Sequence, residues 1–248
     1  MPHVKINFLV KYVFYFIMKI VVLTGGIACG KSTVADIFRK KYRIPIIDCD
    51  VIAYDQQMPG GSAYKKIINT FGKQYLNQDG TINRKMLGQL VFSNEQHLKT
   101  LNRITHPLVK REIIRQVLVN YLHCEPIVIV DIPLYYEAKF QSKFYSDVIT
   151  VAANHETQLK RLMERNNLSE EDALKRINAQ MSVEEKCKLS SIVIRNDSSI
   201  QDLEKQIDAT IRNWRHYKGI IDFLTDVRLL IVIIFIIITM FFILRACL

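Results

Sequence analysis

The sequence predicts an α/β fold in which a five-stranded parallel sheet carries helices on both faces. Short apolar runs rich in β-branched residues recur along the chain, at residues 20–23, 44–47, 127–130, 148–151 and 192–194. Such uninterrupted runs are typical of strands buried on both faces. Longer stretches with helical spacing separate them, and this alternation favours a parallel sheet. The length of 248 residues suits one such domain with an insertion or a tail.

The first predicted strand leads into a glycine-containing loop and then a helix over residues 32–41. The loop, Gly25-Gly-Ile-Ala-Cys-Gly-Lys-Ser32, matches the phosphate-binding pattern G-x-x-x-x-G-K-[ST]. Its glycines let backbone N–H groups surround phosphates, and the helix N-terminus adds a partial positive charge. A chance glycine-rich turn is the competing interpretation, and a dinucleotide site is disfavoured because G-x-G-x-x-G is absent. The motif predicts a P-loop kinase fold that binds ATP through residues Gly25, Gly26, Ala28, Cys29, Gly30, Lys31, Ser32 and Thr33.

Carboxylates end the next two strands. Asp48 and Asp50 follow residues 44–47, and strand alternation predicts that both side chains point the same way, toward bound ATP. There they can hold Mg²⁺ through water and accept a hydroxyl proton, although helix capping by Asp50 is the competing hypothesis. Asp131 ends the third strand, where a second Mg²⁺-linked carboxylate of a P-loop enzyme usually lies. We therefore predict Ser32 and Asp131 as the metal ligands.

Two helical regions are not needed for the sheet. Residues 60–122 are expected to form an inserted substrate domain, and the charged residues 155–188 a mobile lid. Arg161 and Arg165 are four residues apart and share a helix face, from which guanidinium groups can neutralise phosphate charge. The alternative is that they are solvated charges paired with neighbouring glutamates.

The formal net charge of +10 favours phosphorylated small molecules or anionic lipid as partners. No Lys/Arg block is long enough to indicate a nucleic-acid-binding tail. The five cysteines form no C-x-x-C pair, so neither a zinc site nor a disulfide framework is predicted. Oligomeric state is not indicated.

Both ends of the chain are apolar. Residues 229–244 are interrupted only by Thr239 and would span roughly 24 Å as a helix, short of the roughly 30 Å bilayer core. Arg228 and Arg245 flank the run and can snorkel outward. We predict a membrane anchor over residues 227–246, with a buried core helix as the alternative. The flanking charges favour a cytosolic catalytic domain, on the mitochondrial outer membrane or the endoplasmic reticulum.

Residues 1–17 are interpreted as an N-terminal extension of a domain that occupies residues 18–215. The segment is apolar but broken by Lys5, Asn7 and Lys11, and no small-residue cleavage site follows it. Met18 is a candidate start, and a targeting or membrane-contacting leader is the competing interpretation.

Beyond the phosphate motif, several segments resemble the dephospho-CoA kinase family. They are Asp48-Cys-Asp-Val-Ile-Ala53, Phe71-Gly72, Asp79-Gly-Thr-Ile-Asn-Arg84, Thr105-His-Pro107, Asp131-Ile-Pro-Leu134 with Glu137, Arg161 with Arg165, and Arg176-Ile-Asn-Ala-Gln180. They occur in the family's order over roughly residues 18–210. The resemblance is closest to animal dephospho-CoA kinase domain-containing proteins, which also have a hydrophobic C-terminal region.

The resemblance implies transfer of the ATP γ-phosphate to the ribose 3′-hydroxyl of dephospho-CoA, the last step of CoA synthesis. It implies Asp50 as general base, with Lys31 and Arg161 also catalytic. Arg165 and Asn196 would contact ATP, while the substrate side would hold Asp48, Arg84, His106 and Pro133.

The sequence departs from the family pattern at three places. Tyr54 stands where a basic residue is common, Ser190-Ser191 where Ala-Asp is common, and Ala28-Cys29 where bacterial members often have Gly-Ser. None of these departures removes a predicted catalytic group. The alternative functions are another P-loop small-molecule kinase, or a membrane-tethered ATP- or CoA-binding protein with little turnover.

Overall fold

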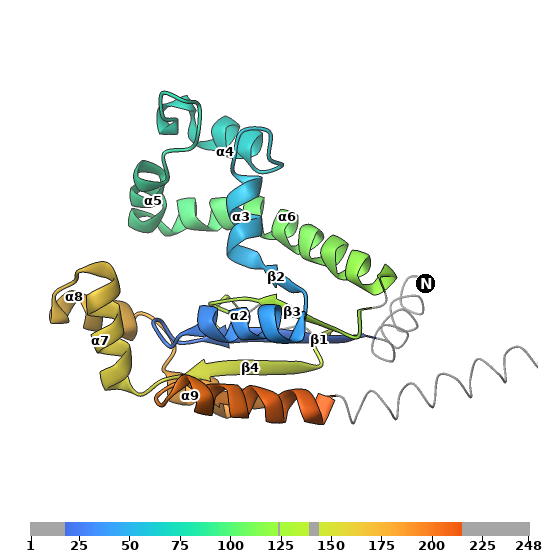
Figure 1. The fold of residues 1–248 in the computed structure, drawn as a ribbon. Coiled ribbons are helices and arrows are strands. Elements are labelled where there is room, and N and C mark those ends of the chain that lie inside the picture. Colours follow the sequence, from blue (N-terminus) through green and yellow to red (C-terminus); the bar gives the residue numbers. More distant parts are fainter. Residues whose placement is uncertain (1–17, 124, 139–143, 215–248) are drawn as a thin grey trace, which may run out of the picture.

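The computed structural model describes residues 18–123, 125–138 and 144–214 (Figure 1). A parallel sheet of five strands has the order β2-β3-β1-β4-β5. Its strands are β1 (Lys19–Gly25), β2 (Ile46–Asp48), β3 (Ile127–Asp131), β4 (Asp147–Ala152) and β5 (Ile192–Arg195). The helices are α2 (Lys31–Tyr42), α3 (Cys49–Gln56), α4 (Tyr64–Phe71), α5 (Arg84–Ser93), α6 (Glu95–Leu122), α7 (His155–Asn166), α8 (Glu170–Asn178) and α9 (Val183–Leu189). Residues 200–214 are also helical. The predicted α/β class, strand number and parallel pairing are confirmed.

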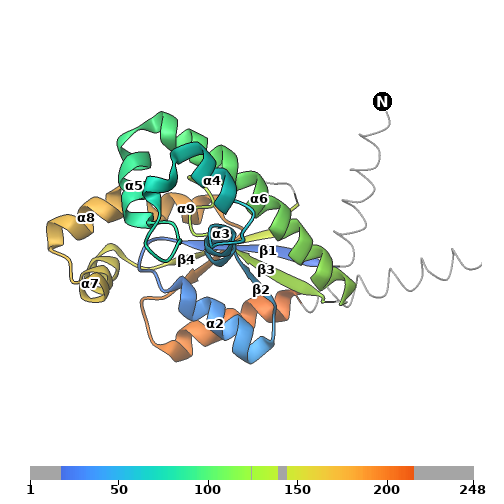
Figure 2. The same cartoon turned by 90° about the horizontal axis from the view of Figure 1, so that it is seen from above.

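Strand β1 lies at the centre of the sheet, and its side chains supply both cores. Val21 and Leu23 pack on one side with α2 and the helical residues 200–214. Ile20 and Val22 pack on the other side with α3 and the second half of α6. Figure 2 shows α2 and α6 on opposite faces of the sheet. Because both faces are covered, a polar residue on either face would lose water, which explains the uninterrupted apolar runs.

The helices between β2 and β3 build a separate small core. Its buried members come from α4, α5, the first half of α6 and the residues just before α4 and α5, and they are Ala63, Ile67, Phe71, Ile82, Leu87, Val91 and Leu108. Helix α6 is 28 residues long, and its second half returns to the sheet, where Ile113 is buried. The predicted insertion therefore ends inside a helix that both regions share.

The segment predicted as a lid divides in a similar way. Figure 1 shows α7 and α8 projecting beyond the sheet. Helix α9 instead packs against β4. Val183 belongs to a sheet core and Lys186 is fully buried. Helix α9 is thus part of the domain body and not of the lid. The charge content of residues 155–188 did not distinguish α9 from α7 and α8.

In the part of the chain that the structure describes, no helix is long and apolar enough to cross a bilayer. The predicted extension over residues 1–17 and the predicted anchor over residues 227–246 both lie outside the described residues.

Candidate active site

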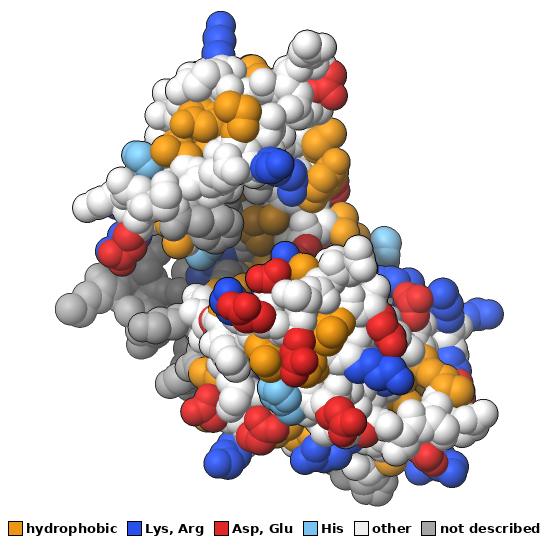
Figure 3. Space-filling model, turned by 90° about the vertical axis from the view of Figure 1, so that its left-hand side faces the viewer, with side chains coloured by type: hydrophobic (Ala, Val, Ile, Leu, Met, Phe, Trp, Pro, Cys, Tyr) orange, Lys and Arg blue, Asp and Glu red, His pale blue; other side chains and the backbone are white. Residues whose placement is uncertain are grey.

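An open cleft of about 730 Å³ lies at the carboxyl ends of the strands. Figure 3 shows a hollow between the insertion and the rest of the molecule on this side. The lining residues come from the phosphate-motif loop, the start of α3, the turn after β3, helix α7 and the segment that joins α8 to α9, and they are Gly25, Gly26, Ile27, Ala28, Cys29, Gly30, Lys31, Ser32, Asp50, Pro133, Arg161, Glu164, Arg165 and Gln180. The structure therefore brings together most of the predicted ATP-binding and catalytic residues. It leaves Thr33, Asp48, Arg84, His106, Asp131 and Asn196 outside this lining.

The phosphate-motif loop, residues 25–32, joins β1 directly to the N-terminus of α2. Gly30 has φ of 83°, and a Cβ there would lie 2.1 Å from the Asn196 side-chain nitrogen. Both the backbone and the available space thus require glycine. Ala28 also has a positive φ, of 58°, which costs a residue with a Cβ more than glycine. The family departure at Ala28 therefore adds local backbone strain, although the loop still adopts the left-handed conformation there.

Three side-chain amides that flank the loop hold it in position. Gln158 donates to the Ile27 carbonyl at 2.8 Å, and the Ile27 amide donates to Gln180 at 3.1 Å. Asn196 donates to the Cys29 carbonyl at 2.9 Å. Asn196 was predicted to contact ATP, but its amide contacts the loop backbone. Sequence reasoning missed Gln158, because a lone glutamine on a charged helix carries no recognisable pattern.

Lys31 and Asp131 form an ion pair at the base of the cleft. The Asp131 side chain is almost fully buried, and burial raises its pKa, against the opposing effect of the Lys31 ammonium. The carboxylates of Asp48 and Asp50 repel Asp131 and raise its pKa further. Three acidic groups and one cation thus share a small volume. This arrangement suits a group such as Mg·ATP, which carries both positive and negative charge.

The expectation that Asp48 and Asp50 lie on one strand is wrong. Strand β2 ends at Asp48, and Asp50 lies in the first turn of α3. The Asp48 carboxylate caps that helix by accepting from the amides of Asp50, at 2.9 Å, and Val51, at 3.0 Å. The predicted cap role thus belongs to Asp48, while Asp50 lines the cleft. Desolvation in the cleft raises the pKa of Asp50, and repulsion by Asp48 adds to this, while Lys31 opposes it.

Helix α7 presents Arg161, Glu164 and Arg165 to the cleft. One terminal nitrogen of Arg161 is buried and has no hydrogen-bond partner within the described residues. A buried guanidinium nitrogen without an acceptor is costly, so this atom fits an anionic ligand. The alternative interpretation pairs these arginines with Glu156 or Glu164, and no such ion pair is present among the described residues, which favours the predicted phosphate role.

The substrate-side residues of the insertion lie apart from the phosphate loop. The Arg84 guanidinium stacks on the Tyr54 ring, 4.1 Å from its centroid, and donates to the Tyr54 carbonyl at 3.3 Å. His106 is exposed on α6 beside Pro107, which lies inside that helix. Tyr54 departs from the family pattern, and its ring and carbonyl hold Arg84, which belongs to the family motif.

The other two departures also have local explanations. The Ser190 hydroxyl contacts those of Tyr136 and Thr150, and Ser191 accepts from the Val148 amide at 2.9 Å. Cys29 is buried inside the loop, and burial raises the pKa of its thiol to about 11. At neutral pH it is therefore a protonated, unreactive thiol.

Comparison with known proteins agrees with this geometry. The family model for dephospho-CoA kinase matches residues 19–202. The chain belongs to the dephospho-CoA kinase family. The match contains every predicted site residue of the cleft, and it stops short of both chain ends.

Curated dephospho-CoA kinases are similar over nearly their whole length. The protein from Bacillus cereus is 45% identical over 192 residues, which is 77% of this chain and 95% of that protein. The protein from Carboxydothermus hydrogenoformans is 45% identical over 199 residues, covering 80% of this chain and 96% of its own.

Two solved structures of 30% identity or more have a similar fold, and one of them is named a dephospho-CoA kinase. TT1252 from Thermus thermophilus is 31% identical, with a TM-score of 0.69, and the match covers 79% of this chain and 97% of that one. Dephospho-CoA kinase from Campylobacter jejuni is 30% identical, with a TM-score of 0.55, over 80% of this chain and 98% of its own.

Proposed function

We propose that this protein transfers the γ-phosphate of ATP to the ribose 3′-hydroxyl of dephospho-CoA. The observation that carries the proposal is the cleft, in which the phosphate-motif loop, Asp50 and the α7 arginines converge. This is the arrangement that phosphoryl transfer requires, because such catalysis is mostly positioning and charge stabilisation. Family membership selects dephospho-CoA as the acceptor.

In this proposal each group of the cleft has one task. The amides of residues 25–32 and the Lys31 ammonium bind the β- and γ-phosphates. Asp50 accepts the proton of the attacking hydroxyl, and its raised pKa moves its basicity toward neutral pH. Arg161 and Arg165 stabilise the charge that develops on the transferred group. The insertion, with Arg84 and His106, contacts the acceptor.

Magnesium would enter with ATP. The described residues contain no cluster of three or more metal-ligating side chains. Mg²⁺ typically keeps several waters and uses one or two protein oxygens plus substrate phosphates. The Ser32 hydroxyl at the N-terminus of α2 and the Asp131 carboxylate fit that role. Lys31, now paired with Asp131, would then be released to the phosphates.

The decisive experiment measures ATP-dependent conversion of dephospho-CoA to CoA by the purified chain. We expect Lys31→Ala to abolish both conversion and tight ATP binding. Asp50→Asn should lower kcat by about 10²- to 10⁴-fold, the usual contribution of a general base, while ATP binding persists. A parent protein that binds Mg·ATP but produces no CoA would disprove the assigned acceptor. Normal turnover by Asp50→Asn would disprove the assigned base.

We also propose that residues 227–246 anchor the protein to a membrane, with the catalytic domain in the cytosol. The support is the apolar run 229–244 between Arg228 and Arg245. Its short length suits a thin bilayer such as that of the endoplasmic reticulum, or the mitochondrial outer membrane.

The anchor is tested by comparing the full chain with a chain that ends at residue 226. We expect the full chain to sediment with membranes after alkaline extraction and the shorter chain to be released with unchanged kcat. Continued sedimentation of the shorter chain would point to residues 1–17 instead.

A further inference from the structure

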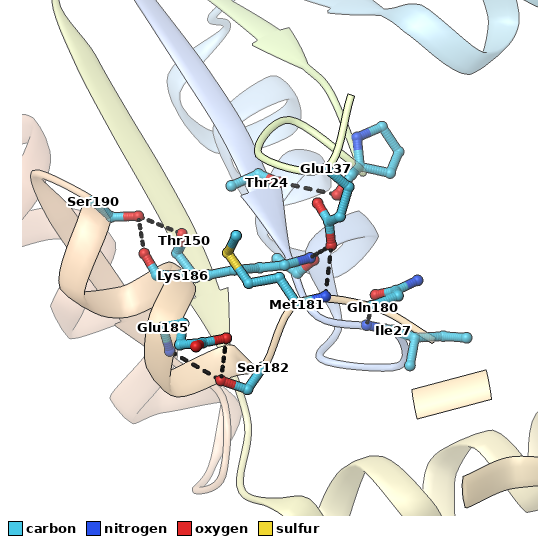
Figure 4. Close-up of polar contacts among 12 residues, drawn as sticks. Thr24, Ile27, Glu137, Thr150, Gln180, Met181, Ser182, Glu185, Lys186 and Ser190 are labelled. Atoms are coloured by element: carbon cyan, nitrogen blue, oxygen red, sulfur yellow. Dashed lines mark hydrogen bonds and ion pairs between the residues drawn. The ribbon is translucent and has the colours of Figure 1, made fainter. Parts of the chain in front are cut away.

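Lys186 is a buried cation near the cleft, but its side chain is not among the residues that line the cleft. Its side chain is 0% exposed, and its ammonium lies 2.7 Å from the Glu137 carboxylate. The same ammonium donates to the carbonyl of Gly25, the first residue of the phosphate-motif loop, at 3.2 Å. Figure 4 shows the Lys186 side chain reaching from α9 to Glu137. A buried charge is costly unless it is paired, and Glu137 supplies that pair.

The Gly25 contact completes a regular pattern along the loop. The carbonyls of Gly25, Ile27 and Cys29 each accept a hydrogen bond from a side chain outside the loop. In a trans peptide the C=O and the following N–H point in opposite directions. When the three carbonyls are held by flanking side chains, the N–H groups of the residues that follow them point the other way. These residues are Gly26, Ala28 and Gly30, which line the cleft, so their N–H groups are directed toward it. Of the three donors only Lys186 is charged.

Glu137 also contacts the lid's return segment. One oxygen of its carboxylate accepts from both Lys186 and the amide of Met181, the latter at 3.1 Å. Met181 belongs to the short segment that returns from α8 to α9, next to Gln180, which accepts from the Ile27 amide. Two neighbouring residues of this return segment thus contact the phosphate site, one directly and one through Glu137 (Figure 4).

We propose that Glu137 and Lys186 are a positioning pair that sets the conformation of the phosphate-motif loop and links it to the lid's return segment. The pair acts through the Gly25 carbonyl and does not touch the nucleotide. This inference deepens the proposed function, because it rests on ATP binding at that loop. It predicts that losing the pair weakens ATP binding selectively and leaves binding of the acceptor unchanged.

The test is equilibrium binding of the β,γ-imido analogue of ATP, with Mg²⁺ and without acceptor. We expect Lys186→Met to raise the Kd at least tenfold and Glu137→Gln, which keeps an acceptor oxygen, to raise it three- to tenfold. The double variant should match Lys186→Met alone, because both residues act through one carbonyl. In turnover assays the KM for ATP should rise and that for dephospho-CoA should stay constant.

Lys19→Met is the matched control. Lys19 lies at the opposite end of β1 and also forms a 2.7 Å ion pair, with Asp147. Its loss should leave the Kd within twofold of the parent value. A folded Lys186→Met variant with unchanged Kd, or an equal rise in both KM values, would overturn the proposal. If Lys186→Met does not fold, an unchanged Kd in Glu137→Gln overturns it. Loss of binding in these variants, combined with no CoA formation by the parent, would refute only the acceptor assignment.

Discussion

At the scale of single residues, the chemistry depends on how Asp48 affects Asp50. Both desolvation and the Asp48 charge raise the pKa of Asp50, and Lys31 opposes them. A general base works only when ionised, so kcat/KM should fall as the pH drops through this raised pKa. The acid limb should therefore lie above the roughly 3.9 of a free aspartate.

Asp48→Asn tests the sign of this coupling. Removing the Asp48 charge should lower the pKa of Asp50 and move the acid limb of kcat/KM to lower pH. Asparagine remains a good helix cap, so α3 should keep its position. An acid limb that stays in place would mean that Asp50 is not the titrating base, or that Asp48 does not act on it.

Tyr54 is a second prediction at this scale. Its ring holds the Arg84 guanidinium, a contact worth about 0.5–1 kcal/mol at an exposed site. We expect Tyr54→Ala to raise the KM for dephospho-CoA a few-fold while the KM for ATP is unchanged. Tyr54→Phe keeps the ring and should behave like the parent. Equal effects of both changes would assign the role to the hydroxyl instead of the ring.

At the scale of elements, α3 shows how a cap places a catalytic group. Asp48 accepts from two free amides in the first turn of α3, those of Asp50 and Val51. Asp48→Ala should cost about 1 kcal/mol of unfolding free energy and also lower kcat, because the turn that carries Asp50 would fray. Thermal unfolding and turnover at pH 7 measure the two effects. If Asp48→Asn lost as much as Asp48→Ala, the charge of Asp48 would matter more than its cap.

Helix α6 connects two cores, which a division into domain and insertion does not anticipate. Leu108 packs with the insertion and Ile113, five residues later, packs with the sheet. The insertion is therefore carried on a helix whose other half is fixed to the sheet. The position of the insertion relative to the phosphate-motif loop therefore depends on α6.

At the scale of the whole molecule, the fold extends beyond the region that the family model matches. The match ends at residue 202, yet Leu203, Ile207, Ile211 and Trp214 are buried in the core around α2. Trp214 stacks on Phe38, with ring centroids 5.9 Å apart. The domain therefore needs this last helical segment in order to cover one face of the sheet.

Trp214→Ala tests this requirement. We expect it to reduce the unfolding free energy by about 3–5 kcal/mol, the usual range for a buried tryptophan. Ile200→Ala is the control on the same helical segment, since Ile200 is 48% exposed, and it should change stability by less than about 0.5 kcal/mol. Chemical denaturation measures both. A small loss for Trp214→Ala would show that the segment is dispensable.

The sequence by itself determined the sheet and the phosphate site. Uninterrupted apolar runs indicate strands buried on both faces, because such strands do not alternate apolar with polar residues. The loop motif is recognisable because each of its residues contacts the phosphates or permits the backbone to do so, and these constraints lie within eight consecutive positions. Resemblance across the insertion and the lid then pointed to the family and its reaction.

Only the tertiary structure decided how the rest of the site is held. The pairing of Lys186 with Glu137 and Gly25 joins residues that are 49 and 161 positions apart, so no local pattern reveals it. The roles of Asp48, Gln158 and Asn196 depend on where a helix begins or which carbonyl lies within reach. A local pattern predicts what a segment can form, whereas the partner of a buried polar group is fixed only when distant segments pack together.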